Sequence, residues 1–73
     1  MDIKFIKILS EVLEIDANKI NSELELDEEI WSSISIISFI DEIYQEYDIE
    51  LDGESLEEIK TVKDLEDFTF NAQ

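Results

Sequence analysis

The chain has no proline, and Gly53 is its only glycine. These two residues usually mark flexible linkers and tight hairpins, so their near absence leaves neither indicated. Apolar residues recur instead at helical spacing over most of the sequence. No internal repeat and no boundary divides the chain, so we expect one domain over residues 1–73. The expected fold class is all-α.

The first apolar stretch predicts an amphipathic helix close to the N-terminus. Asp2 is placed to favour its start, since a negative charge stabilises a helix N-terminus. The apolar residues follow the i, i+3, i+4, i+7 pattern and are Phe5, Ile6, Leu9, Val12 and Leu13. With acids among them and no small-residue cleavage site, they favour a helix over a signal peptide.

Residues 16–30 break the helical pattern and predict a long loop. Ile20, Leu24 and Leu26 are spaced to hold this loop against a core. Loops of this length exceed the usual range and are often functional.

A second helix is predicted from about Ser33 to Tyr47. We expect its inner stripe to consist of Ile34, Ile37, Ile40, Ile43, Tyr44 and Tyr47, widened by Ile36 and Phe39. The widened stripe indicates either a deeply buried helix or one that presents apolar side chains to a partner.

Two capping patterns follow in the C-terminal third. Ser55 and Glu58 match the spacing of a capping box and predict one short helical turn. Thr61 and Asp64 repeat this spacing before a last helix, whose expected inner face is Val62, Leu65 and Phe68. The chain therefore predicts a small four-helix bundle of three main helices and one short one, with a long loop between the first two.

The charge is strongly negative and unevenly distributed. Twenty-one acidic residues face five lysines, and no base lies between Ile20 and Ile59. This field repels nucleic acid and anionic membranes, so we expect neither as a partner. It favours encounters with basic protein surfaces, although simple solubility would also explain it.

Residue types exclude most catalytic chemistry. The chain has no cysteine and no histidine, so no thiol nucleophile, no triad that uses histidine and no usual zinc site can be assembled. We expect no enzyme and no metal site. The missing thiols fit a reducing cytoplasm, and no apolar run approaches the roughly 20 residues of a membrane span.

The sequence resembles the acyl carrier proteins over nearly its whole length. The resemblance rests on "EVLEID" at the end of the first helix, "INSELEL" in the loop, "EYDIEL" after the second helix and "IKTVKDLEDF" at the close. It implies a carrier that holds acyl or related intermediates as thioesters on a covalent 4'-phosphopantetheine arm derived from coenzyme A. The cargo would pass between separate biosynthetic enzymes of the fatty-acid or specialised-metabolite type.

The resemblance places the arm on Ser33. The family usually has an Asp-Ser-Leu motif there, and Ile34 stands for the leucine. Ser32 replaces the aspartate: it can cap the helix equally well but lacks the charge that favours the helix dipole. Trp31 is similar to a subgroup in which tryptophan precedes the motif. Together these departures favour a specialised pathway.

The same resemblance implies partners that dock on the second helix. These are a phosphopantetheinyl transferase and acyl-handling enzymes with basic patches. The expected docking residues are Trp31, Ser32, Ile34, Ile36, Asp41, Glu42 and Glu46, with Ile36 as the candidate for the apolar contact. Ser35 and Ser38 are expected on the outer or inter-helix surface without a chemical role. We expect a monomer in the cytoplasm.

Three other interpretations remain open. One is a carrier-like acidic interaction module that is never modified, which Ser32 would suit. Another is a divalent-cation protein, since "DIELDGESLEEI" begins like an EF-hand loop with Asp48, Glu50, Asp52 and Gly53, but has Ile59 where the loop requires glutamate. The third is an acidic mimic of nucleic acid.

Overall fold

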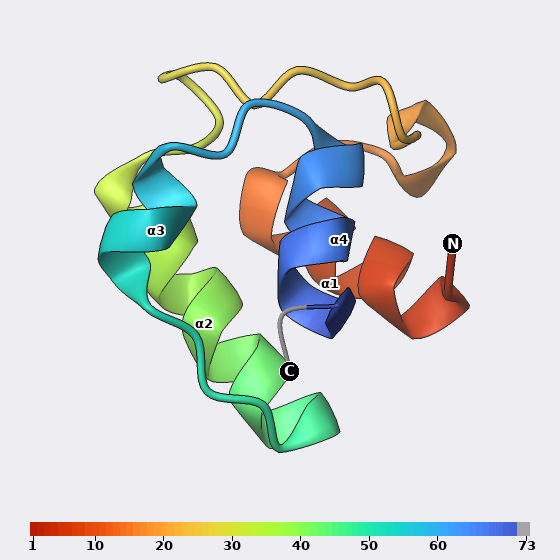
Figure 1. The fold of residues 1–73 in the computed structure, drawn as a ribbon. Helices are drawn as coiled ribbons and strands as arrows, with labels where there is room; N and C mark the ends of the chain where they lie inside the picture. The colour runs from red at the N-terminus through yellow and green to blue at the C-terminus, as the bar shows by residue number, and fades with distance from the viewer. Residues whose placement is uncertain (72–73) are drawn as a thin grey trace.

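The computed structural model describes residues 1–71. Within them the chain forms four α-helices and one short 3-10 turn, which are α1 (Ile3–Leu13), η1 (Ala17–Lys19), α2 (Ser33–Tyr47), α3 (Gly53–Glu57) and α4 (Val62–Asn71). Figure 1 shows the short α3 beside α2, with α4 in front of α1 and the long connection crossing above α4. The all-α four-helix bundle predicted from the sequence is confirmed.

Helix α1 begins where the sequence predicts. Asp2 is its N-cap, and its carboxylate accepts a hydrogen bond from the Lys4 backbone N–H at 3.3 Å. The helix buries four residues, which are Phe5, Ile8, Leu9 and Leu13. Two further contacts tie its N-terminus to the end of α2: Tyr47 donates to Asp2 at 2.7 Å, and Lys4 pairs with Glu46 at 3.4 Å.

The long connection between α1 and α2 is held to the fold by side chains and backbone together. Ile20 and Leu26 are buried and Leu24 is half-buried, as the sequence predicts. Backbone hydrogen bonds join it to the start of α4, from Leu26 N–H to the Lys60 carbonyl at 2.8 Å and from Val62 N–H to the Leu24 carbonyl at 3.0 Å. This loop is therefore fixed against the start of α4.

The bounds of α2 agree with the prediction, but its rotation does not. The buried residues are Ile36, Phe39 and Ile43, whereas Ile34 and Ile37 are 77% and 67% exposed and Tyr44 is also exposed. The predicted stripe is right at Ile43, and Ile40 and Tyr47 are half-buried against the core. It is wrong at the exposed positions, because an i+3 row drifts by about 60° around the helix at each step. Spacings of three and four residues in alternation keep the buried residues on one face.

Helix α3 begins earlier than predicted. Asp52 is its N-cap and accepts from the Glu54 N–H, while Ser55 lies inside the helix and donates its hydroxyl to Asp52 at 3.0 Å. The predicted capping box of Ser55 and Glu58 is therefore wrong. The other cap is confirmed: Asp64 N–H donates to the Thr61 hydroxyl at 3.2 Å at the start of α4.

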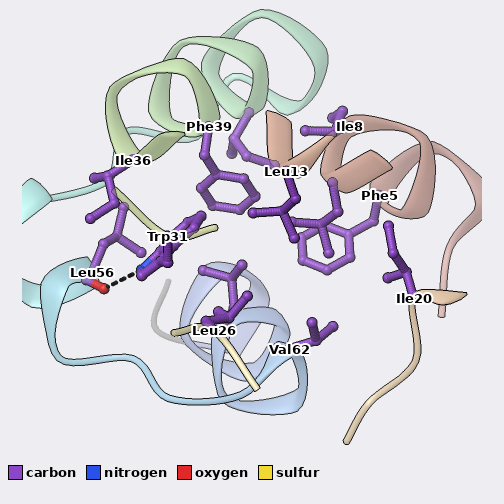
Figure 2. Packing of buried hydrophobic residues seen from close by; sticks show 13 residues of the cluster. Phe5, Ile8, Leu13, Ile20, Leu26, Trp31, Ile36, Phe39, Leu56 and Val62 are labelled. Carbon is purple, nitrogen blue, oxygen red and sulfur yellow. Dashed lines mark hydrogen bonds between the residues drawn. The ribbon is translucent and has the colours of Figure 1, made fainter. Parts of the chain in front are cut away.

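The core has aromatic side chains at its centre (Figure 2). The rings of Trp31 and Phe5 each meet Phe39 edge-on, at centroid distances of 5.6 and 6.0 Å. On α4, Val62 and Leu65 are fully buried as predicted and Phe68 is half-buried; the burial of Thr69 was not predicted. None of the helices in the described part of the chain has the length and apolar character that crossing a membrane would require.

Candidate functional site

Ser33 is the first residue of α2 and is exposed to solvent. The helix lies with its first turn at the surface and its middle in the core, where Phe39 and Ile43 have no exposure. The Ser33 hydroxyl thus stands on a helix end whose position is set by a packed core, and it is accessible to another protein.

Ser32 is the N-cap of this helix. Its backbone is extended, and its hydroxyl accepts a hydrogen bond from the Ser35 N–H at 3.3 Å. Its carbonyl accepts the Ile36 N–H at 2.9 Å, the first backbone bond of the helix. Ser32 therefore performs the capping that an aspartate would perform here, without the charge.

Ser35 adds a contact that sequence reasoning missed. Its hydroxyl donates to the Ile30 carbonyl at 2.8 Å and lies 3.1 Å from the Ser32 hydroxyl. Its spacing of three residues from the cap is the one signal in the sequence that could have indicated this role. Ser38 is exposed, as expected for a surface serine.

Trp31 fastens the segment before the helix to α3. Only 6% of its surface is exposed, and the indole N–H donates to the Leu56 carbonyl at 2.8 Å (Figure 2). Ahead of it, the Asp27 carboxylate accepts from the N–H groups of Glu29 and Ile30 at 2.9 and 3.2 Å. The segment from Asp27 to Trp31, which leads to Ser33, is therefore fixed by hydrogen bonds at both of its ends.

The expected docking residues occupy different environments. Ile34, next to Ser33, is largely exposed, and so is Ile37 one turn further on. Trp31 and Ile36 are each only 6% exposed, because the apolar face of α2 that contains Ile36 is the one turned to the core. The expectation that Ile36 is available for an apolar contact is therefore corrected, because its side chain is buried, whereas those of Ile34 and Ile37 are exposed.

A surface groove of about 430 Å³ extends from this apolar patch between α2 and the segment that follows it. Six residues line it, and they are Ile37, Ile40, Asp41, Tyr44, Glu50 and Leu51. The lining is apolar in the middle, with two carboxylates beside it. Such a surface suits a partner that presents apolar side chains within a basic rim.

The three predicted docking acids are not equivalent. Asp41 is exposed and accepts a hydrogen bond from the Gln45 amide at 2.7 Å. Glu46 pairs with Lys4 across the junction with α1. Glu42 is half-buried and lines a hollow of about 290 Å³ together with Lys4 and Lys7. Asp41 is therefore the acid of this set that lies beside the groove.

In the segment that resembles the beginning of an EF-hand loop, two acidic residues have structural roles at helix ends. Asp48 ends α2 in the left-handed conformation with φ of 58°, and Asp52 caps α3. Ile59, at the position that needs a bidentate glutamate, packs half-buried against the core. Among residues 1–71, no group of three or more acidic side chains is placed to hold a metal ion.

A comparison with protein families adds an independent finding. A family model described as "Phosphopantetheine attachment site" matches residues 4–69. The match begins in α1, ends in α4, and includes the exposed serine at the start of α2. A comparison with curated proteins gives no match.

Proposed function

The chain belongs to the phosphopantetheine-attachment family, whose members are non-catalytic carriers of a covalent 4'-phosphopantetheine arm, and from this membership we propose that Ser33 is the residue that carries the arm. The observation that supports the choice is the position of its hydroxyl. Ser33 is exposed at the first position of α2, whereas the neighbouring hydroxyls of Ser32 and Ser35 are tied to each other. The protein would then act as an acyl carrier.

In the attachment reaction the carrier supplies only the serine hydroxyl. The Ser33 oxygen attacks the pantetheine-linked phosphorus of coenzyme A, and the bond from this phosphorus to the bridging oxygen breaks. Adenosine bisphosphate leaves, and the serine proton passes to a base on the transferase. When attached, the arm supplies a thiol for thioesters of acyl or related intermediates.

The surface around Ser33 supports a role in delivery to separate enzymes. Ile34 and Ile37 offer apolar contact, and Asp41 lies beside the adjoining groove. The partners proposed are the transferase and acyl-handling enzymes with basic docking patches. The cargo is acyl, of the fatty-acid or specialised-metabolite type.

The charge supports the rest of the assignment. A net charge of -16 opposes self-association and binding to nucleic acid or anionic membranes, which supports a monomer. The lack of cysteine fits a reducing cytoplasm, and the single helical bundle fits one domain over residues 1–73. The second candidate is a carrier-like module that is never modified. Ser32 favours it, because the position before Ser33 lacks a negative charge.

One experiment separates the two candidates. The purified protein is incubated with coenzyme A, magnesium and a broad-specificity phosphopantetheinyl transferase, and its intact mass is recorded. We expect a gain of one phosphopantetheine in the wild type and in Ser32→Ala, and no gain in Ser33→Ala. A wild-type protein that gains no mass under these conditions favours the unmodified module.

A further inference from the structure

Three serine hydroxyls share the first turn of α2, and two of them form a closed set of contacts. The Ser35 hydroxyl is 2.8 Å from the Ile30 carbonyl and 3.1 Å from the Ser32 hydroxyl. The Ser32 hydroxyl is also 3.3 Å from the Ser35 backbone nitrogen. These contacts join a residue inside the helix to two residues that precede it.

The donors in this set follow from the chemistry of its members. A carbonyl oxygen only accepts, so the Ser35 hydroxyl must give its proton to Ile30. The Ser32 hydroxyl then donates to the Ser35 oxygen and accepts the Ser35 N–H. Both hydroxyl protons are used within the turn, and both hydroxyls are held in one orientation.

Ser33 lies inside this closed set. Ile30 and Ser32 precede it and Ser35 follows it, so its backbone is held from both sides while its side chain stays exposed. The helix itself does not depend on the set, because Ile36, Phe39 and Ile43 hold α2 in the core. Loss of the Ser35 hydroxyl should therefore loosen the first turn and leave the fold intact.

We propose that Ser35 is a positioning residue of the attachment site, holding the Ile30–Ser32 segment against the first turn of α2 so that Ser33 is presented in one geometry. The inference rests on the proposed role of Ser33. In this proposal Ser35 promotes modification through the shape of the turn, and its hydroxyl forms no bond to the arm.

The test measures modification kinetics with full-length variants and the same transferase. Ser35→Ala removes the hydroxyl, Ser35→Thr keeps it, and Ser38→Ala is the matched control at an exposed serine of the same helix. A loosened turn lowers the fraction of carrier in the competent geometry, which weakens apparent affinity in proportion. Losing one hydrogen bond lowers the ratio of competent to loosened carrier about fivefold, so we expect the KM for the carrier to rise, by at most about fivefold, in Ser35→Ala with kcat nearly unchanged.

A second readout is independent of modification. The Ile36 amide bonds to the Ser32 carbonyl at 2.9 Å, so its hydrogen exchange reports opening of the first turn. We expect exchange about fivefold faster in Ser35→Ala, and wild-type rates in Ser35→Thr and Ser38→Ala. Wild-type KM or unchanged Ile36 exchange in Ser35→Ala would overturn the inference, as would an equal rise in KM for Ser38→Ala.

The two proposals fail in different ways. If the wild type gains no arm, the proposed function fails, and with it the role of Ser35 in modification. If the wild type is modified and Ser35→Ala is modified with the same KM, only the positioning role fails.

Discussion

At the scale of single residues, the position of Ser33, the proposed attachment site, depends on the side chains of its neighbours. Ser32 and Ser35 hold the turn, and Trp31 holds the segment before it. Trp31 contributes in two ways, through the hydrogen bond from its indole to the Leu56 carbonyl and through edge-on packing against Phe39. A substitution can separate these contributions.

Trp31→Phe should keep most of the packing and lose the hydrogen bond. The Leu56 carbonyl still accepts from the Ile59 N–H at 3.2 Å, so it is not left without a partner. We therefore expect a loss of about 1–2 kcal/mol in the free energy of unfolding. Trp31→Ala should cost roughly 3–5 kcal/mol, because it also opens a cavity.

The measurement is urea denaturation followed by far-UV circular dichroism, since the only tryptophan is removed. Equal stability of Trp31→Phe and wild type would show that the indole N–H does not hold α3. Equal loss in the Phe and Ala variants would show that packing against Phe39 contributes nothing.

At the scale of helices, much of the fold could be predicted from local signals. The starts of α1 and α4 follow from Asp2 and Thr61, because a cap acts on the N–H groups of its own first turn. The rotation of α2 could not be predicted, because two apolar stripes compete on it and only packing in the folded core selects Ile36 over Ile34. The choice of Ser33 as the attachment site rests on the family resemblance. The Ser35 contact could not be predicted, because it depends on how the turn before α2 folds back on the helix.

The corrected rotation of α2 gives a paired prediction. Ile37 is 67% exposed and Ile36 is 6% exposed. Ile37→Ala should change stability by less than about 0.5 kcal/mol and raise the transferase KM for the carrier about fivefold, through lost apolar contact. Ile36→Ala should cost about 2–5 kcal/mol of stability.

Denaturation and modification kinetics on the same preparations check this pair. A reversed result, with Ile37→Ala strongly destabilised and Ile36→Ala neutral, would restore the stripe that the sequence first indicated. A wild-type KM in Ile37→Ala would remove this residue from the docking surface.

The contact between the ends of α1 and α2 predicts a titration shift. The hydrogen bond from Tyr47 is the main cause that lowers the pKa of Asp2, followed by the bond from the Lys4 N–H. The pKa of Tyr47 is raised, first by its burial and then by Asp2. Since the folded pKa of Asp2 lies below the unfolded value, its contribution to stability is complete above the unfolded pKa and is lost as pH falls through the folded one.

Tyr47→Phe should therefore raise the pKa of Asp2 toward the ordinary value of 3.8. The ring of residue 47 can still pack edge-on against Phe70, so the core is kept. The pKa is read from the Asp2 side-chain carboxyl carbon by NMR. Tyr44→Phe, at an exposed tyrosine of the same helix, should leave the Asp2 pKa unchanged; equal values in all three proteins would contradict the assignment.

At the scale of the whole molecule, charge repulsion opposes folding. The described fold measures 26 × 24 × 19 Å and holds two ion pairs, both on exposed side chains, against a net charge of -16. At 0.01 M salt the screening length is about 30 Å, so every charge acts on every other. At 0.1 M salt it is about 10 Å, so repulsion across the molecule is largely screened.

Stability should therefore rise with ionic strength. Between about 0.01 M and 0.5 M sodium chloride we expect the Tm to increase by roughly 5 °C or more. Magnesium, calcium and sodium chlorides are then compared at equal ionic strength by circular dichroism. Similar gains indicate screening, whereas a saturable gain at low calcium would support the cation-binding interpretation, and a Tm independent of salt would contradict the charge argument.

The most direct test of the central claim is to locate the attached arm within the chain. Four serines lie between residues 32 and 38, so a gain in intact mass alone does not identify the modified hydroxyl. Fragmentation of the modified protein in a mass spectrometer should place the phosphopantetheine on Ser33. An arm found on Ser32, Ser35 or Ser38 would contradict the account, because it would make the exposed first residue of α2 something other than the attachment site.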